Sequence, residues 1–225
     1  MPTTDIRIPA GDVALEGSWS VPAGARGAVV FAHGSGSSRF SPRNAKVAAR
    51  LFTAGFATLL LDLLTSQEER LDAITAELRF DIELLARRLS RATEWLRSAP
   101  DGRGLPAGYF GASTGAAAAL RAAADKPEWV QAIVSRGGRP DLARLFLPRV
   151  EAATLLIVGG RDAPVIEMNR SAYADLRGEK ELVIVPGATH LFEEPGALEE
   201  VARLATAWFE RRLVSGGGRR AASAR

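Results

Sequence analysis

The feature that most restricts the fold of this chain is the alternation of short apolar runs with longer segments of helical spacing. The runs at 27–33 ("GAVVFAH") and 57–64 ("ATLLLDLL") have the length and composition of strands buried on both faces. Between and after such runs, segments such as 81–99 repeat apolar residues every three or four positions. This alternation predicts an α/β fold, with a mostly parallel central sheet covered by helices on both faces.

The expected elements cover the chain up to residue 214, which we interpret as a single domain. A polar-faced hairpin is expected at 6–8 and 13–20. Buried strands are expected at 27–33, 57–64, 107–111, 130–135, 154–159 and 182–185. Helices are expected at 44–54, 81–99, 114–125, 165–176 and 198–213. Only one short helix fits between 135 and 154, so we expect no large lid domain. Residues 215–225 are predicted to be a flexible basic tail.

Composition excludes several classes of function. The formal net charge is +3, but three arginines lie after Ser215, and without them basic and acidic residues are equal in number. We therefore expect no nucleic-acid partner. With no cysteine and two histidines we predict no metal site. The start shows no secretory pattern and no apolar run is long enough to span a membrane, so we expect a cytoplasmic protein without a membrane partner. The sequence leaves a homo-oligomer open.

The stretch "GASTG", at 111–115, places Ser113 between a predicted strand and a predicted helix. In such a junction the flanking glycines allow a sharp turn that lifts the serine hydroxyl off the sheet, where it can act as a nucleophile. The alternative is a glycine-rich strand–helix junction without a catalytic role.

A nucleophilic serine needs a base, and the chain offers only His33 and His190. His190 follows the last buried strand, and Asp162 follows the strand before it. Ser113, Asp162 and His190 thus occur in the order nucleophile, acid, base, which predicts a catalytic triad. Taken singly, His190 could be an ordinary loop histidine and Asp162 a helix cap. Asp62, a competing acid, better suits a structural role.

An oxyanion hole needs backbone N–H donors near the nucleophile. Thr114 follows Ser113 at the start of a helix, and the loop "HGSGSSR" at 33–39 offers a second donor, which we assign to Ser35. His33 is expected to hold this loop in place. The loop does not fit a dinucleotide-binding fingerprint, because Arg39 stands where the third glycine should be. It remains open that it is an ordinary glycine loop.

Six stretches together resemble the α/β-hydrolase superfamily and, within it, the dienelactone hydrolase-like branch. They are "HGSGSSRFSPRN", "TLLLDLLTSQEE", "GASTG", "SRGGRPDLA", "GGRDAPV" and "GATHLFEEPG". The chain is also similar to hydrolase domains joined to phosphoribosyltransferase-like domains. The resemblance implies acyl transfer by Ser113, His190 and Asp162 without a cofactor. Dienelactone hydrolases proper use a cysteine nucleophile, and the serine here favours a carboxylesterase for small-molecule esters.

Two side chains, Arg39 and Arg79, are candidates to hold a substrate carboxylate, with a solvated surface role as the alternative for each. Together with His33 they are the predicted lining of the substrate pocket. A peptidase or acyltransferase would use the same triad, and a non-catalytic binding module would be expected to lack one of its members. These remain the alternatives to an esterase.

Overall fold

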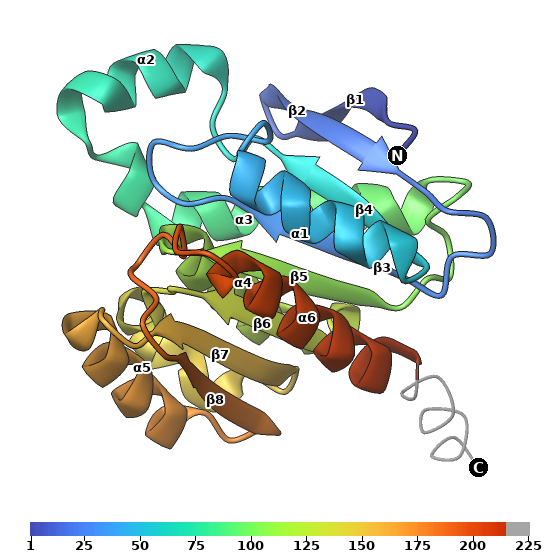
Figure 1. Ribbon diagram of the computed structural model, residues 1–225. Helices are drawn as coiled ribbons and strands as arrows, with labels where there is room; N and C mark the ends of the chain where they lie inside the picture. Colours follow the sequence, from blue (N-terminus) through green and yellow to red (C-terminus); the bar gives the residue numbers. More distant parts are fainter. Residues whose placement is uncertain (215–225) are drawn as a thin grey trace.

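The computed structural model describes residues 1–214, and the tail predicted at 215–225 lies outside the described residues. Within them, eight strands form one sheet (Figure 1). In chain order the strands are β1 (Thr4–Ala10), β2 (Val13–Ser20), β3 (Gly27–Ala32), β4 (Phe56–Leu61), β5 (Ala107–Ala112), β6 (Ala132–Arg136), β7 (Ala153–Gly159) and β8 (Lys180–Val185).

The sheet order is β1-β2-β4-β3-β5-β6-β7-β8. The first two strands form the expected antiparallel hairpin, β2 also pairs antiparallel with β4, and all other pairs are parallel. From β3 the chain turns to β4 on one side and then crosses to β5 on the other. The direction of winding therefore reverses between β3 and β5, and in open α/β sheets ligands bind outside the carboxyl ends of the strands at such a point.

Helices cover both faces of this sheet. They are α1 (Pro42–Thr53), α2 (Ser66–Thr75), α3 (Ile82–Ser98), α4 (Thr114–Asp125), α5 (Ala163–Asp175) and α6 (Ala197–Phe209). Helices α1 and α6 pack together on one face, while α3 and α4 pack on the other, where α5 joins them through the 3₁₀ segment Pro140–Arg149 (Figure 1). The α/β fold predicted from the sequence is thus confirmed, and the described residues contain no large lid domain.

The two apolar cores explain why the strands could be recognised. Every residue of β3, β4, β5, β6 and β7 is buried, because helices cover both faces of these strands. One core lies beneath α3 and α4 and the other beneath α1 and α6. The outer strand β1 has one buried residue, Ile8, in keeping with its expected polar face.

Helix α2 was not predicted from the sequence. It stands away from the sheet at one end of the molecule, as Figure 1 shows. Its Leu71 and Ile74 are exposed, so it lacks the apolar stripe that a helix packed on a sheet would carry. A capping box starts the helix instead: Thr65 accepts from the N–H of Glu68, whose carboxylate accepts from the N–H of Thr65.

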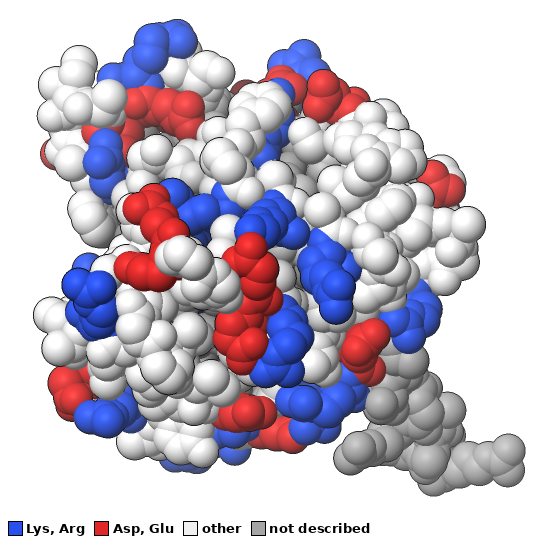
Figure 2. Space-filling view, viewed as in Figure 1, with Lys and Arg blue, Asp and Glu red and all other residues white. Residues whose placement is uncertain are grey.

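Charges of both signs are interspersed on the face that Figure 2 shows, over α1 and α6. Some form ion pairs that link separate elements, such as Lys46 of α1 with Glu199 of α6. None of the helices within residues 1–214 is long and apolar enough to cross a membrane.

Candidate active site

The turn between β5 and α4 holds Ser113 in an unusual backbone conformation, with φ 51° and ψ −120°. Its N–H donates to the oxygen of Arg136 at 3.3 Å, and its own oxygen accepts from the N–H groups of Ala116 and Arg139 at 3.1 Å. A residue other than glycine with positive φ costs about 1–3 kcal/mol and persists only where the surrounding structure enforces it. The hydrogen bonds around the turn therefore hold Ser113 in a strained conformation.

Close packing explains the two glycines that flank Ser113. A Cβ atom at Gly111 would lie 2.4 Å from the Cα of Ala116, and one at Gly115 would lie 2.2 Å from the backbone oxygen of Ala32 in β3. Neither position has room for a side chain, because the elbow presses against both its own helix and the neighbouring strand. The sharp strand–turn–helix expected of "GASTG" is present.

Asp162 and His190 meet beyond the ends of β7 and β8. The Nδ1–H of His190 donates to Oδ2 of Asp162 at 2.6 Å. Asp162 occupies the N-cap position of α5, yet its side chain makes no capping bond. The alternative of a helix-capping aspartate is therefore wrong. Because Nδ1 carries the proton, Nε2 of the neutral ring is an acceptor, the tautomer that a general base requires.

One cavity of about 180 Å³ brings His190 and Ser113 together. The loop that carries His190 is itself strained, since Phe192 has φ 57° although its ring is fully buried in the core beneath α6. Burial of that ring fixes the loop two residues after His190.

The glycine loop after β3 crosses directly over the elbow. A Cβ at Gly34 would lie 3.0 Å from the Cβ of Ser113, so the loop backbone approaches the serine closely. The hydroxyls of Ser35 and Thr114 lie 3.1 Å apart. Within residues 1–214 neither of their backbone N–H groups has a protein acceptor. The residues predicted to donate to an oxyanion are thus side by side, with both N–H groups unused.

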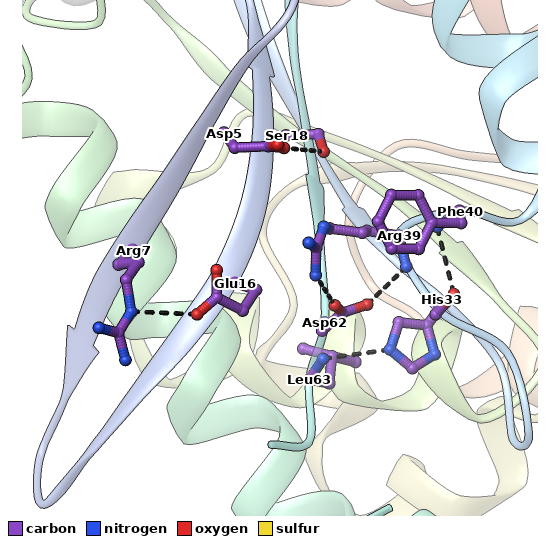
Figure 3. Close-up of polar contacts among 10 residues, drawn as sticks. Asp5, Arg7, Glu16, Ser18, His33, Arg39, Phe40, Asp62 and Leu63 are labelled. Atoms are coloured by element: carbon purple, nitrogen blue, oxygen red, sulfur yellow. Dashed lines mark hydrogen bonds and ion pairs between the residues drawn. The ribbon is translucent and has the colours of Figure 1, made fainter. Parts of the chain in front are cut away.

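His33 is buried and ties this loop to the end of β4. Its Nδ1–H donates to the oxygen of Gly34 at 2.9 Å. Its Nε2 accepts from the N–H of Leu63 at 3.1 Å, as Figure 3 shows. Both bonds together require the neutral ring, and burial lowers the pKa of His33 below its ordinary 6.5. His33 also lines a larger cavity of about 550 Å³ on the other side of the loop.

The two arginines that the sequence suggested as carboxylate ligands already bind carboxylates of the protein. Arg39 donates to Asp62 through its backbone N–H and its guanidinium, which also lies over the ring of Phe40 (Figure 3). Asp62 follows the last residue of β4 and has the structural role expected of it. Arg79 donates to Asp72 at 2.6 Å. Arg79 lines the larger cavity, but Arg39 does not.

Sequence reasoning missed a buried cation beside the nucleophile. Arg136, the last residue of β6, is only 7% exposed and lines the same cavity as Ser113 and His190, as does Arg43 of α1. An arginine that ends an apolar strand next to the elbow strand is a weak signal that could have pointed to it. Within residues 1–214 no group of three His, Cys, Asp or Glu side chains is placed to hold a metal ion.

Comparisons with known proteins agree with this architecture. The model of the dienelactone hydrolase family matches residues 15–213. A crystal structure of a dienelactone hydrolase from Anabaena variabilis is 59% identical, with a TM-score of 0.92 over 94% of this chain and 98% of that one. The esterase Est1E from Butyrivibrio proteoclasticus shares the fold at 14% identity and a TM-score of 0.76, over 91% of this chain and 97% of that one.

A curated relative from Mycobacterium tuberculosis, described as a candidate phosphoribosyl transferase, is 59% identical over 95% of this chain. That match covers 47% of the relative, so this chain spans less than half the length of the curated protein that it resembles.

Proposed function

The chain belongs to the dienelactone hydrolase family, and from that premise we propose that it is a serine hydrolase that cleaves carboxylic esters of small substrates. The observation that carries the proposal is the hydrogen bond from His190 to Asp162 in a cavity that His190 shares with the strained Ser113. A serine hydroxyl attacks slowly unless a base removes its proton, and this cavity supplies one.

Hydrolysis then takes two steps. The Oγ of Ser113 attacks the ester carbonyl carbon as its proton passes to Nε2 of His190, and the same proton is then donated to the leaving alcohol. The bond from the carbonyl carbon to the alcohol oxygen breaks and leaves an acyl-serine. Water, activated by His190, releases the acid and restores Ser113. Asp162 keeps the ring in the required tautomer and stabilises it once it is protonated.

The negative charge on the carbonyl oxygen during each step requires donors that are already in place. The N–H groups of Ser35 and Thr114 support this role, because both lack protein acceptors and Thr114 begins α4. His33 would act as a positioning residue, since it holds Gly34 and hence the loop that carries Ser35.

A panel of p-nitrophenyl esters beside aminoacyl amides, assayed on the wild type and on Ser113→Ala, tests the proposal. We expect hydrolysis of short-chain esters by the wild type and less than a few per cent of that turnover in the variant. Mass spectrometry should find a fluorophosphonate bound to Ser113. Amide cleavage faster than ester cleavage would instead make the protein a peptidase.

Asp162→Asn provides a second test. The asparagine amide can donate to Nδ1 and so favour the wrong tautomer, which in such triads lowers kcat by about 10⁴-fold. Asp175→Asn is a matched control, because Asp175 pairs with Arg144 at the surface, outside both cavities. Equal activity in the two variants would contradict the role of Asp162.

A further inference from the structure

Arg136 lies in the Ser113 cavity as a buried cation without a carboxylate partner. It is 93% buried, and no acidic side chain among residues 1–214 lies within ion-pair distance of it. Its Nη2 donates to the neutral side-chain oxygen of Asn44 at a long 3.4 Å, and its buried Nε has no partner. Taking an arginine out of water without an anion costs several kcal/mol. The protein carries this cost in the lining of the cavity that holds Ser113.

The nearby positive charge of Arg43 adds to the cost of burying Arg136. Burial first, and then the positive charge of Arg43, lower the pKa of Arg136 to about 10, so the side chain remains charged at neutral pH. Arg43 lines the same cavity and also has a buried Nε without a partner, while its Nη1 reaches Glu193 at 3.2 Å. Two cations thus share one cavity next to Ser113.

A helix end adds to the positive potential. Arg43 lies in the first turn of α1, which contains no acidic residue, and the N-terminus of a helix carries a partial positive charge. Glu194, another nearby carboxylate, accepts from the N–H of Thr189 at 3.0 Å. Glu193 pairs with Arg43, and among residues 1–214 neither acid of the histidine loop forms an ion pair with Arg136, in contrast to Asp62 and Asp72, which neutralise Arg39 and Arg79.

The position of the cavity says which part of a substrate would meet these cations. His190 lines this cavity and does not line the larger one, which lies across the glycine loop and includes Leu63, Leu64 and Leu85. His190 must protonate the leaving alcohol, so the alcohol part of the ester lies on the His190 side. The acyl part then extends into the larger cavity across the glycine loop.

We propose that the preferred substrates are esters whose alcohol part carries an oxyanion, a carboxylate or a phosphate, bound by Arg136 and Arg43. This inference rests on the proposed function. The cavity volume of about 180 Å³ is enough for a small acid. A guanidinium matches both oxyanions, because its fork of N–H donors can bind two oxygens at once.

Three acetyl esters test the inference. They are 2-acetoxyacetate, 2-acetoxyethyl phosphate and the neutral 2-acetoxyacetamide, which has nearly the shape of the first. We expect wild-type kcat/KM to be at least tenfold higher for one of the charged esters than for the amide, after correction for their spontaneous hydrolysis. Which charged ester is faster decides between a carboxylate and a phosphate.

The variant Arg136→Met removes the charge but keeps the length of the side chain. The ratio of charged to neutral kcat/KM should fall by about tenfold to a hundredfold, since a hydrogen bond to a charged group is lost. This ratio is measured on one preparation, so a loss of folded enzyme cancels. Arg43→Gln should lower the same ratio. Arg50→Gln is the matched control, because Arg50 is exposed near the other end of α1, and its ratio should stay within twofold of the wild type.

Each remaining outcome is decisive. Equal hydrolysis of charged and neutral esters by the wild type, or an unchanged ratio in Arg136→Met, overturns the inference and leaves the proposed function standing. If no ester is cleaved and Ser113 does not react with a fluorophosphonate, the proposed function fails. The anion site is then judged by calorimetry with 2-hydroxyacetate and inorganic phosphate. Binding to the wild type that Arg136→Met loses supports the site, and no binding to the wild type overturns it.

Discussion

Replacement of Ser113 by glycine should make the protein more stable while it destroys the activity. Serine at φ 51° and ψ −120° carries backbone strain of about 1–3 kcal/mol, and glycine adopts such angles without that cost. Glycine in turn loses about 0.5–1 kcal/mol more backbone entropy on folding than alanine. From these two contributions, the free energy of unfolding of Ser113→Gly should be roughly 0.5–2 kcal/mol higher than that of Ser113→Ala. Both variants lack the hydroxyl, so the comparison isolates the backbone.

Urea unfolding of the two variants and the wild type measures this difference, and thermal unfolding should show a rise of a few degrees, at about 2–4 °C per kcal/mol for a chain of this size. Ala112→Gly is the matched control. Ala112 is buried in β5 without a positive φ, so glycine there should destabilise the protein. If Ser113→Gly is no more stable than Ser113→Ala, the turn is not strained and the argument from its conformation fails.

Four further predictions follow from the same region. His190→Ala should abolish ester hydrolysis and fluorophosphonate labelling, whereas His33→Asn should lower kcat only in part; the reverse pattern would make His33 the base. Burial lowers the pKa of His33, so below pH 6.5 the unfolded chain binds a proton at this residue more readily than the folded chain does. The free energy of unfolding should therefore fall as the pH drops below 6.5. A His33→Asn variant that shows the same pH dependence in urea unfolding would contradict this. Gly115→Ala should cost more than about 3 kcal/mol or prevent folding, because its Cβ would lie 2.2 Å from a backbone oxygen of β3; a near-normal melting temperature would refute the clash. Burial raises the pKa of Glu68, but hydrogen bonds, chiefly those from Arg88, lower it to about 2. The Glu68–Arg88 pair therefore stabilises the protein above pH 4.5, and this stabilisation is lost as the pH falls toward 2. Glu68→Gln should lower the free energy of unfolding by about 2 kcal/mol at pH 7, and an unchanged unfolding midpoint would argue against this.

Sequence patterns identified the buried strands because burial on both faces leaves a continuous apolar run, as in β3 and β7. The residues of the candidate triad were predicted for a different reason. Few residue types can perform acyl transfer, and Ser113, Asp162 and His190 each follow a strand, so the sheet brings them to one edge. Helix α2 was not predicted because it has no apolar stripe, and its start is set by a capping box.

Charge compensation could not be read from the sequence, because it depends on tertiary neighbours. Arg39 and Arg79 looked like free cations, yet Asp62 and Asp72 neutralise them. No sequence pattern assigned a role to Arg136. It is buried only because β6 lies beside β5 in the sheet and α1 covers its side chain, and neither contact follows from a pattern near residue 136.

The departures from ordinary packing gather around one cavity, and this is a physical argument for where function resides. Within residues 1–214 only three residues other than glycine have positive φ: Ala76, Ser113 and Phe192. Ser113 lines the cavity and Phe192 lies two residues from His190, which also lines it. Arg136, a buried cation without an anion, lies at the same place. A sequence selected for stability alone would relax each of these, with glycine at 113 or an apolar residue at 136. These features are expected to occur together if the strained turn positions a nucleophile and the unpaired cation binds an anion. Ser113→Gly and Arg136→Met test these two causes separately.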